Sequence, residues 1–506
     1  MSALKEYIEL LRKNDILTDA SAAADHLSEE VRFVTYDSRL VKPGTLFICK
    51  GSAFKKEYLI EAMKNGAIAF VSEKDFGLQD QILVRDVRRA MPYLGEFFFG
   101  SPEKSLKITG ITGTKGKSTT AYYLKAIIDD WLLDLSAKES AIISSIDVYD
   151  GKSIQESHIT TPESLMLMEH FRNAVDSGID YLTMEVSSQA LKYNRVDLIN
   201  FDVGVFLNIS EDHISPIEHP DFDDYFKSKL KIFEQTDHAC INRNSDHFDE
   251  IRDAANTCKE VTVFGVDFNN GGEFDQNDCD LLGYDVRKSK EGFTFRIKTD
   301  SFDEEFDITM PGSFNVENAL AAAASALSYG IPLKYIKSGL HRARSKGRME
   351  LFKSKDGKIR CIVDYAHNKL SFERLYGAVR AEYPESDIIA IFGCPGNKAQ
   401  LRRKDLPNVV NQYAKKAYIV AEDPGEEPVD KISNEIASNL KIPYEIIEDR
   451  GEAIEKAISE IKNPTVILIT GKGDETRQKY GRKYIDCESD AKLTEKFIKN
   501  YDMAND

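Results

Sequence analysis

The feature that most constrains the fold is a repeated junction, in which an apolar strand ends and a cluster of small or polar residues follows at once. Helical stretches separate these strands, and such alternation is typical of a parallel α/β sheet. Parallel sheets bind ligands beyond the carboxyl ends of their strands. One junction is consistent with a simple turn, but repetition in two regions predicts a cleft between two α/β domains. The junctions follow residues 182–186, 203–209, 362–363, 388–392 and 466–469.

The chain has 506 residues, which is long for one hydrophobic core and favours about three domains. Gly100-Ser101-Pro102 is a plausible joint, and a basic segment over 341–348 leads into the last region. Between about 261 and 310, apolar and polar residues alternate, which predicts antiparallel strands added to the central sheet. We therefore predict an α/β protein with three domains, at 1–103, 104–340 and 341–506.

Composition excludes several classes of protein. The net charge of −17 argues against a nucleic-acid binder, which needs a basic surface to neutralise phosphates. The first 20 residues read as an amphipathic helix with charges throughout, so they do not form a secretory signal. No run of about 18 apolar residues is present, so no membrane span is predicted. The seven scattered cysteines suggest free thiols, and we expect a cytoplasmic protein.

A glycine-rich loop is the strongest chemical signal. The run Gly113-Thr114-Lys115-Gly116-Lys117-Ser118-Thr119-Thr120 follows a predicted strand at 107–112 and precedes a predicted helix at 121–130. Backbone N–H groups in such a loop cradle phosphates, and the helix N-terminus adds its dipole. Lys117 would reach the β- and γ-phosphates of ATP, and the Ser118 or Thr119 hydroxyl would bind Mg²⁺. The standard spacing requires glycine where this chain has Ile111, and the alternative is a glycine-rich turn that merely contains lysine.

Lys229 is the most informative lysine. It lies in a predicted helix on a face shared with aromatic and aliphatic residues, opposite Lys227 and Lys231. A lysine on an apolar face should have a lowered pKa and a neutral amine available for chemistry. A lysine that snorkels at the edge of the core is an equally good interpretation of the pattern alone.

Four further residues stand at strand ends or at a helix start. Glu185 and His213 end or follow neighbouring strands and could approach a metal near the phosphates, although a strand-end histidine is more often structural. Asn315 and Asn318 open an alanine-rich helix. Because asparagine is a good N-cap, capping explains one of them but hardly both.

Taken together, these residues resemble a known family, the Mur ligases, and the resemblance runs almost end to end. Met184-Glu185-Val186-Ser187-Ser188, Asn208 with Asp212-His213, and Tyr225 with Lys229 and Phe233 match its central domain. Phe314-Asn315-Val316, Gly347-Arg348-Met349-Glu350 and Asp364-Tyr365-Ala366-His367 continue the match. Asp37-Ser38-Arg39 and Thr160-Thr161-Pro162 point to the MurE type, the UDP-N-acetylmuramoyl-tripeptide synthetases of peptidoglycan synthesis.

The resemblance implies a fold and a reaction. It implies an N-terminal domain for the UDP substrate, a central P-loop-type ATPase domain and a C-terminal Rossmann-like domain for the amino acid. ATP would phosphorylate the terminal carboxylate of UDP-MurNAc-L-Ala-D-Glu, and an incoming amine would displace phosphate from the acyl phosphate. The expected partners are that nucleotide and a free amino acid, with no nucleic acid or membrane, and the expected protein is a monomer that acts in cell-wall biogenesis.

The resemblance also implies roles for individual residues. Lys117 would hold phosphates, Ser118 and Glu185 one Mg²⁺, and His213 with a carbamylated Lys229 (N6-carboxylysine) a second. The predicted ATP-binding residues are Gly113, Thr114, Lys115, Gly116, Lys117, Ser118, Thr119, Asn315, Asn318, Arg348 and Asp364. The predicted contacts to the UDP substrate are Ser38 in the uridine pocket and Thr160, Thr161, Ser187 and Arg195 around the muramoyl-peptide portion.

The choice of amino acid rests on departures from the family pattern. The Asp-Asn-Pro-Arg signature of diaminopimelate-adding members reads Glu422-Asp423-Pro424-Gly425, so the cation for the far carboxylate of diaminopimelate is missing. Asp423 and Glu475 are instead candidates to bind an ammonium, which favours L-lysine over diaminopimelate, with ornithine third. Lys398, Arg402 or Arg403 could supply the missing cation and restore diaminopimelate, and part of this acidic run belongs to solvated loops.

Two rival functions remain at this point, one within the same superfamily and one from another class. A folylpolyglutamate synthetase shares the last two domains, but such enzymes lack the module that carries Asp37-Ser38-Arg39. A non-catalytic nucleotide-binding regulator would not need to retain Lys117, Glu185, His213 and Lys229 together. Lys55-Lys56, which stand where the family has Asp-Gly, leave the detail of the uridine pocket open.

Overall fold

The computed structural model describes residues 2–51, 54–157, 159–212, 214, 218–268, 278–289, 292–345 and 347–505. These residues divide into two compact units. The first contains the chain up to Val266, a short stretch that ends at Leu282, and Leu320–Gly339. The second contains a short stretch from Asp267, then Gly283–Ala319 and Leu340–Asp506. Among the described residues, the chain therefore passes between the units after Val266, inside β14, inside α9 and inside α10, whose bounds are given below.

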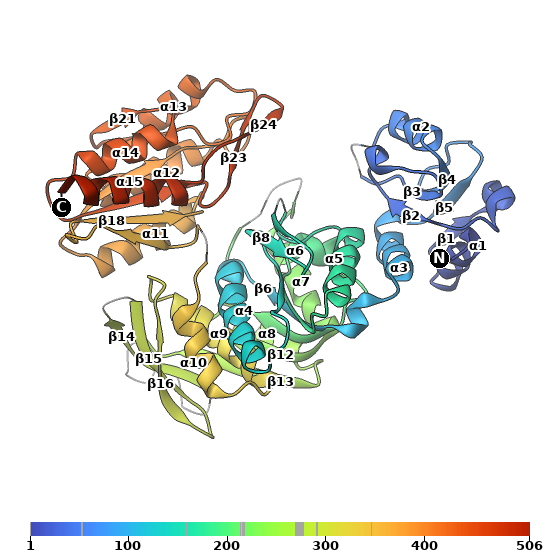
Figure 1. The fold of residues 1–506 in the computed structure, drawn as a ribbon, viewed down its shortest axis with the longest axis horizontal. Helices are drawn as coiled ribbons and strands as arrows, with labels where there is room; N and C mark the ends of the chain where they lie inside the picture. Colours follow the sequence, from blue (N-terminus) through green and yellow to red (C-terminus); the bar gives the residue numbers. More distant parts are fainter. Residues whose placement is uncertain are drawn as a thin grey trace. The chain divides into compact units, whose positions relative to one another are not determined.

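The first unit begins with a small sheet in the order β1-β5-β4-β3-β2, in which only the edge strand β1 runs antiparallel to its neighbour. Alternate residues of its strands face different helices, as the two-residue repeat of a strand requires. Phe47 and Phe70 pack with α2, whereas Leu46 and Val71 pack with α1 and α3 (Figure 1). The bounds are β1 Leu17–Asp19, β2 Phe33–Thr35, β3 Thr45–Ile48, β4 Ala67–Ser72, β5 Gln81–Val84, α1 Leu4–Lys13, α2 Lys56–Lys64 and α3 Val87–Phe99, with 3₁₀ turns at Ser21–His26, Ser38–Leu40 and Pro102–Ser105.

The larger sheet of the first unit has the order β13-β12-β11-β6-β10-β7-β8-β9. Its strands are parallel from β13 to β7, and β8 and β9 add an antiparallel edge. The bounds are β6 Lys107–Thr112, β7 Ala141–Ile143, β8 Asp147–Tyr149, β9 Ile154–Glu156, β10 Tyr181–Glu185, β11 Phe201–Phe206, β12 Thr236–Asn242 and β13 Glu260–Val266. The helices are α4 Lys117–Asp134, α5 Ser164–Asp176, α6 Ser188–Lys192, α7 Phe222–Leu230 and α8 Phe248–Ala255, with a 3₁₀ turn at Lys231–Gln235.

Tyr329 and Gly339, which lie far along the chain, pack against β6 and α4. The Tyr329 hydroxyl lies 2.8 Å from Oγ1 of Thr109 in β6. Gly339 approaches α4 so closely that an added Cβ would lie 2.5 Å from the Cα of Ile127. Only glycine fits at such a contact. These residues follow or belong to α9 Asn315–Ser328 and α10 Leu333–Arg342.

The second unit holds a sheet in the order β17-β18-β22-β19-β20-β21, parallel except for the edge strand β17. Helices α11, α12 and α13 pack on one face, and α14 and α15 pack on the other. The bounds are β17 Glu350–Lys353, β18 Ile359–Asp364, β19 Asp387–Phe392, β20 Lys416–Ile419, β21 Tyr444–Ile446, β22 Thr465–Thr470, α11 Lys369–Glu382, α12 Arg402–Tyr413, α13 Val429–Ala437, α14 Arg450–Ser459 and α15 Asp490–Asn505. This doubly wound arrangement confirms the predicted α/β class.

Antiparallel strands complete the second unit. β15 Gly292–Lys298 pairs with β16 Asp303–Ile308, next to β14 Leu281–Ser289. Phe293, Phe295 and Ile297 are buried in β15, as the alternating pattern predicts. A hairpin of β23 Arg477–Tyr480 and β24 Lys483–Asp486 follows β22.

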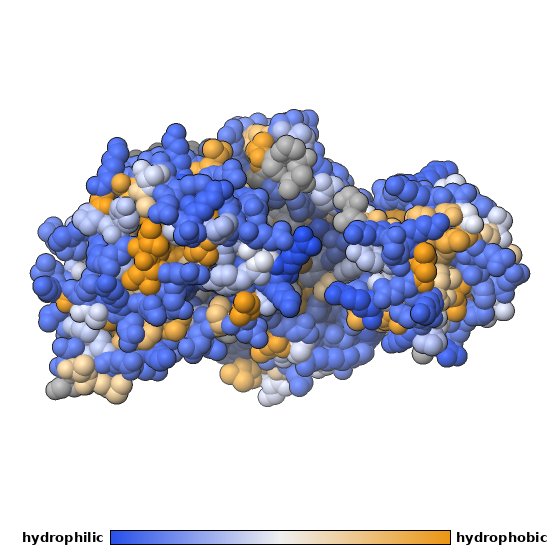
Figure 2. Space-filling view, turned by 90° about the horizontal axis from the view of Figure 1, so that it is seen from above, coloured by the Kyte–Doolittle hydropathy of each residue, from blue (hydrophilic) through white to orange (hydrophobic). Residues whose placement is uncertain are grey.

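The surface agrees with the acidic, polar composition. Figure 2 shows one face covered mainly by hydrophilic residues, with hydrophobic side chains in small groups. No helix among the described residues is long and apolar enough to cross a membrane. All the cysteines are free thiols, as their scattered positions suggest.

Candidate functional site

The glycine-rich loop joins β6 to α4 in the first unit. Gly113 and Gly116 have φ angles of 151° and 89°, in a region that side chains disfavour. A Cβ on Gly113 would also lie 2.9 Å from the Cβ of Leu207. The helix begins at Lys117, four residues before the predicted start, so the N–H groups of its first turn face the loop.

Asn208, just beyond β11, holds this loop in shape. Its Oδ1 accepts from the Lys115 backbone N–H at 2.9 Å, and its Nδ2 donates to the Lys115 carbonyl at 3.1 Å. The Asn208 carbonyl accepts from the Thr114 N–H at 3.0 Å. The Thr114 hydroxyl in turn lies 3.1 Å from the hydroxyl of Tyr225 in α7. The loop is thus preorganised by the neighbouring strand, which reduces the ordering that ligand binding requires.

Three lysine side chains converge on the loop. The Lys117 and Lys229 amines both donate to the Gly113 carbonyl, at 2.8 and 3.0 Å. The Lys115 amine pairs with Asp212 at 3.1 Å. Thr119 lies half-buried in the first turn of α4. The predicted phosphate-binding residues of the loop are therefore brought together, with positive charge beside them.

Lys229 lies inside the first unit, and only 2% of it is exposed. Lys227 and Lys231, on the other side of the helix, are exposed, as the helical periodicity predicts. Burial, reinforced by Lys117, lowers the pKa of Lys229 well below its ordinary value. Its amine lies 4.9 Å from the Tyr225 ring centroid. The structure therefore favours a buried, nucleophilic amine over a snorkelling lysine.

Ser118 and Glu185 are linked through Ser145, which the sequence analysis did not single out. The Ser118 and Ser145 hydroxyl oxygens lie 3.0 Å apart, and the Ser145 N–H donates to Glu185 Oε1 at 2.7 Å. Glu185 is 1% exposed. The described residues contain no cluster of three His, Cys, Asp or Glu side chains that could hold a metal. A hydroxyl with one carboxylate fits Mg²⁺, which takes few protein ligands beside substrate phosphates. His213 lies outside the described residues.

Residues predicted to contact the muramoyl-peptide portion adjoin Glu185. The Thr161 hydroxyl donates to the Glu185 carbonyl at 3.0 Å and accepts from the Ser187 N–H at 2.9 Å. Arg195 donates to the Thr161 carbonyl at 3.2 Å, and Thr160 is half-buried next to it in the chain. Ser187 also caps α6, since its hydroxyl accepts from the Ala190 N–H.

Two acidic residues, neither predicted, hold predicted substrate contacts in the first unit. Glu163 pairs with Arg195 at 3.1 Å and with Lys50 at 2.7 Å. Glu61 in α2 accepts from the hydroxyl of Ser38 at 2.7 Å. No local pattern marks either contact, because the partners are far apart in sequence.

The predicted adenine-side residues belong to the second unit. Asn315 opens α9 and donates to the Pro311 carbonyl at 2.6 Å, and Asn318 donates to Asn315 at 2.9 Å. Both asparagines are buried. Asp364, at the end of β18, accepts from the backbone N–H groups of Met349 and Ala366. The Arg348 guanidinium lies 4.5 Å from the Tyr365 ring centroid.

Asp423 and Glu475 share one cation, Lys472. The Lys472 amine lies 3.1 Å from Asp423 Oδ1 and also contacts the Glu475 carboxylate. Burial by itself lowers the pKa of Lys472, but the two carboxylates outweigh it and raise the pKa. Both predicted residues are thus brought to one point, next to the loop of Gly425. Lys472 itself was missed, although it stands directly after β22 in Gly471-Lys472-Gly473.

Arg403 is not available to bind the far carboxylate of diaminopimelate, because it is already paired. Its guanidinium is buried and binds Glu427 at 2.7 Å and Glu435 at 2.6 Å. Gly425 has a φ of 58°, a conformation that favours glycine. Glu422 is buried beside this loop, and burial raises its pKa to about 7.

Comparisons of the sequence with known proteins identify the family to which the chain is similar. Residues 111–326 match the family described as the Mur ligase middle domain, and residues 347–473 match the Mur ligase, glutamate ligase domain. A relative from Streptococcus agalactiae serotype Ia, named UDP-N-acetylmuramoyl-L-alanyl-D-glutamate--L-lysine ligase, is 38% identical over 92% of each chain.

Two solved structures share the fold. One is a UDP-N-acetylmuramoyl-L-alanyl-D-glutamate--2,6-diaminopimelate ligase, with a TM-score of 0.66 and 22% identity over 99% of both chains. The other is a MurF ligase from Thermotoga maritima in complex with ADP. It has a TM-score of 0.60 and 16% identity, and the match covers 93% of this chain and 99% of that one.

Proposed function

This chain belongs to the Mur ligase family, and from that premise we propose that it is the ATP-dependent ligase that joins L-lysine to UDP-N-acetylmuramoyl-L-alanyl-D-glutamate in peptidoglycan synthesis. The structural observation that carries the ligase chemistry is the convergence of Lys115, Lys117 and Lys229 on a phosphate loop. The N-terminal residues 1–103, the middle residues 104–340 and the C-terminal residues 341–506 are the proposed domains for the UDP substrate, ATP and the amino acid.

The proposed reaction has two steps. The γ-phosphoryl group of ATP passes to the terminal carboxylate of the dipeptide, which gives ADP and an acyl phosphate. The amino group of the incoming amino acid then attacks the acyl carbon, and the tetrahedral intermediate loses phosphate and a proton to give the amide. The protein contributes mainly position and charge, with Lys117 beside the β- and γ-phosphates.

Magnesium is the proposed metal, with Ser118 and Glu185 as its protein ligands. When bound, the ion supplies positive charge to the phosphate oxygens. The Ser145 N–H already fixes one Glu185 oxygen, which orients the carboxylate next to the loop. His213 and Lys229 are proposed for a second ion. We propose that Asn315, Asn318, Arg348 and Asp364 bind the adenosine part of ATP, and that Ser38, Thr160, Thr161, Ser187 and Arg195 bind the UDP substrate.

Lys229 is proposed to carry a carbamate. A neutral lysine amine adds to CO₂ to form a carbamate and release one proton, and the lowered pKa of Lys229 supplies that neutral form. The product turns a buried amine into an anion with two oxygens, which suits a hard metal ion. It also places a negative charge near Lys115 and Lys117, whose positive charges compensate it.

Charge balance supports L-lysine as the amino acid. Asp423, Glu475 and Lys472 together carry one negative charge in excess, and Lys472 contacts both carboxylates. A side chain that ends in ammonium neutralises this excess. The side chain of diaminopimelate ends in an ammonium and a carboxylate, so it leaves the excess unbalanced and brings a like charge to two carboxylates. Arg403 cannot receive that carboxylate while Glu427 and Glu435 hold it.

The amino-acid choice is tested by direct competition. We expect the enzyme, given equal concentrations of L-lysine, meso-diaminopimelate and L-ornithine with ATP, Mg²⁺ and UDP-MurNAc-dipeptide, to form mainly the lysine tripeptide. Product mass is the readout. A product that contains mainly diaminopimelate would show that the acidic cluster does not select the side chain.

Matched variants test which residues select the amino-acid substrate. Asp423→Asn and Glu475→Gln should each raise the KM for L-lysine by roughly tenfold, the effect of losing one charge-assisted contact, with a smaller change for diaminopimelate. Glu426→Gln is the control, because Glu426 lies in the same loop and pairs with exposed Arg482. Equal effects from all three variants would assign the selection to another part of the enzyme.

The rival functions make different predictions. A folylpolyglutamate synthetase would release phosphate with a folate and glutamate, whereas we expect phosphate release only with UDP-MurNAc-dipeptide and an amino acid. A non-catalytic regulator would bind nucleotide without releasing phosphate under either condition. One phosphate-release assay with both substrate sets therefore separates the three functions.

A further inference from the structure

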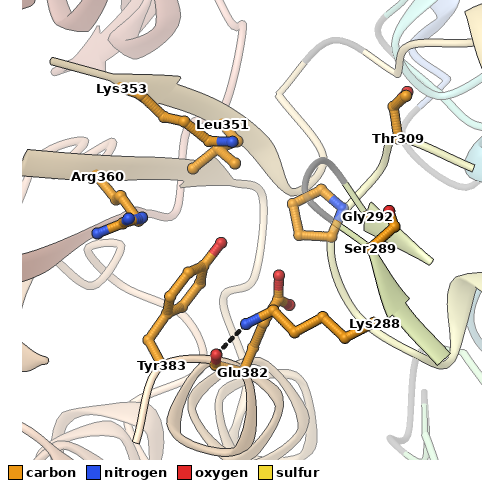
Figure 3. Close-up of a pocket in the computed structure, with 10 residues that line it drawn as sticks. Lys288, Ser289, Gly292, Thr309, Leu351, Lys353, Arg360, Glu382 and Tyr383 are labelled. Atoms are coloured by element: carbon orange, nitrogen blue, oxygen red, sulfur yellow. Dashed lines mark hydrogen bonds between the residues drawn. The ribbon is translucent and has the colours of Figure 1, made fainter. Parts of the chain in front are cut away.

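A pocket in the second unit is lined by none of the residues assigned above, although Pro311 in its lining accepts from Asn315 at 2.6 Å. It has a volume of about 220 Å³ and is lined by β14 and β15, the loop after β16, β17, β18 and the end of α11. Its lining residues are Lys288, Ser289, Gly292, Thr309, Pro311, Leu351, Lys353, Arg360, Glu382 and Tyr383. Figure 3 shows their side chains around this space.

The lining is strongly cationic. Lys288, Lys353 and Arg360 face one carboxylate, that of Glu382, so the lining carries two positive charges in excess. The Glu382 carboxylate is already engaged, because its Oε2 accepts from the Gly312 N–H at 3.2 Å. Among the described residues, no ion pair joins any of the three cations to a carboxylate.

Two of the cations lie directly opposite each other. Lys353 in β17 and Arg360 in β18 are register partners in an antiparallel pair, so their side chains leave the sheet on the same face. Like charges at such a position destabilise a sheet. An anion between the two side chains would turn this repulsion into attraction.

The third cation is held in place by neutral contacts. The Lys288 amine donates to the Glu382 carbonyl at the end of α11 and lies 4.4 Å from the Tyr383 ring centroid. Arg360 lies 5.2 Å from the same ring, so Tyr383 separates the two cations, as Figure 3 shows. Burial, followed by repulsion from Arg360 and Lys353, lowers the pKa of Lys288 although Glu382 opposes the shift.

The Lys288 and Arg360 side chains have more N–H donors than the hydrogen bonds described for them use. An ammonium has three donors and a guanidinium has five. The Lys288 amine uses one on the Glu382 carbonyl, and Arg360 uses one on the Gly357 carbonyl at 3.0 Å. The hydroxyl of Ser289 also belongs to the lining. The pocket therefore offers several N–H donors and an excess of two positive charges within a space suited to a small ligand.

We propose that this pocket is a binding site for a phosphate dianion, either inorganic phosphate or the phosphate group of a monoester. A dianion neutralises the excess charge, and its tetrahedral oxygens can accept from Lys353 and Arg360, which are register partners on one face of the sheet. Lys288 adds its positive charge from the other side of the Tyr383 ring. None of its lining residues belongs to the phosphate loop, and the proposal does not depend on the proposed ligase function. Binding there would link the Lys353 and Arg360 side chains of β17 and β18 through one ligand.

The binding test uses the full chain with Lys117→Ala, which weakens competition from the phosphate loop. Inorganic phosphate and glycerol phosphate are titrated separately, and binding is followed by calorimetry. We expect saturable binding of at least one of them, weakened at least about tenfold by Lys353→Ala or Arg360→Ala. Lys462→Ala is the control, an exposed lysine outside the pocket. Binding of glycerol phosphate but not inorganic phosphate would identify the monoester as the ligand class.

A second variant keeps the proposal testable if those proteins fold poorly. Lys353→Glu places opposite charges across β17 and β18, so it should raise the Tm without phosphate by about one to a few degrees. The same variant should abolish the rise in Tm that phosphate gives the parent chain. Lys462→Glu should change neither quantity. Absence of saturable binding, or binding that all the variants share with the parent, would overturn the proposal.

Discussion

Lys117→Ala is expected to lower the rate of ligation by about a thousandfold or more. The amine of Lys117 lies over the loop, where it donates to the Gly113 and Thr114 carbonyls. In the reaction it serves the β- and γ-phosphates, whose charge rises as the phosphoryl group is transferred. Alanine is a good helix former at the first position of α4, so the helix should persist. Phosphate release with saturating ATP, Mg²⁺, UDP-MurNAc-dipeptide and L-lysine is the measurement.

Lys125→Ala is the matched control for this variant. Lys125 lies in the same helix but binds Asp129 and the Ser140 carbonyl, away from the loop. We expect it to reduce stability while activity stays near that of the parent. Circular dichroism and the Tm report whether each protein is folded. If Lys117→Ala retained activity within about threefold of the parent, the loop would not be the phosphate site.

Lys229→Ala is expected to lower activity by about a hundredfold or more, because it removes the proposed carbamate and with it a metal ligand. Short carboxylates such as acetate or formate should restore part of the activity, since they can occupy the space of the carbamate oxygens. In the parent enzyme, ¹³C-labelled CO₂ should give a carbamate signal in the NMR spectrum. That signal should be absent from Lys229→Ala.

Two comparisons separate the carbamate from a purely structural role. Lys227→Ala, two residues away in α7, removes an exposed lysine that pairs with Asp223 and should leave activity and the NMR signal unchanged. Lys229→Met keeps the length of the side chain and should remain folded, because a buried amine is harder to desolvate than a thioether. Full activity of Lys229→Met with ordinary Mg²⁺ dependence would falsify the carbamate proposal.

The local periodicity of the sequence was sufficient to predict part of the candidate site. The helical repeat predicted that Lys229 lies on the apolar face of its helix and Lys227 on the opposite face, and the structure confirms this, with Lys229 buried and Lys227 exposed. The repeat alone did not distinguish a buried Lys229 from a snorkelling one. The strand, glycine-rich loop and helix were also predicted in the right order. The start of α4 was wrong by four residues, because Ser118, Thr119 and Thr120 have weak intrinsic helix propensity. Packing against the sheet overrides that preference.

Contacts between distant residues could not be predicted in this way. Ser145 reaches Glu185 across 40 residues, and Lys472 reaches Asp423 across 49. Each partner is an ordinary polar residue in its own segment, and only the order of parallel strands brings the two together. The resemblance to a family supplied roles for several residues, but it did not reveal that Lys472 contacts both residues predicted to bind the amino acid.

The hydrogen bond between Thr109 and Tyr329 has a consequence for biosynthesis, since it joins residues 220 positions apart. A ribosome that adds about 5–20 residues per second needs roughly ten to forty seconds to make that interval. During that time β6 and α4 have been made, but the segment that packs on them, which ends at Gly339, has not. The nascent chain therefore presents an uncovered apolar surface beside its phosphate loop, which makes this interval the natural moment for a chaperone to bind.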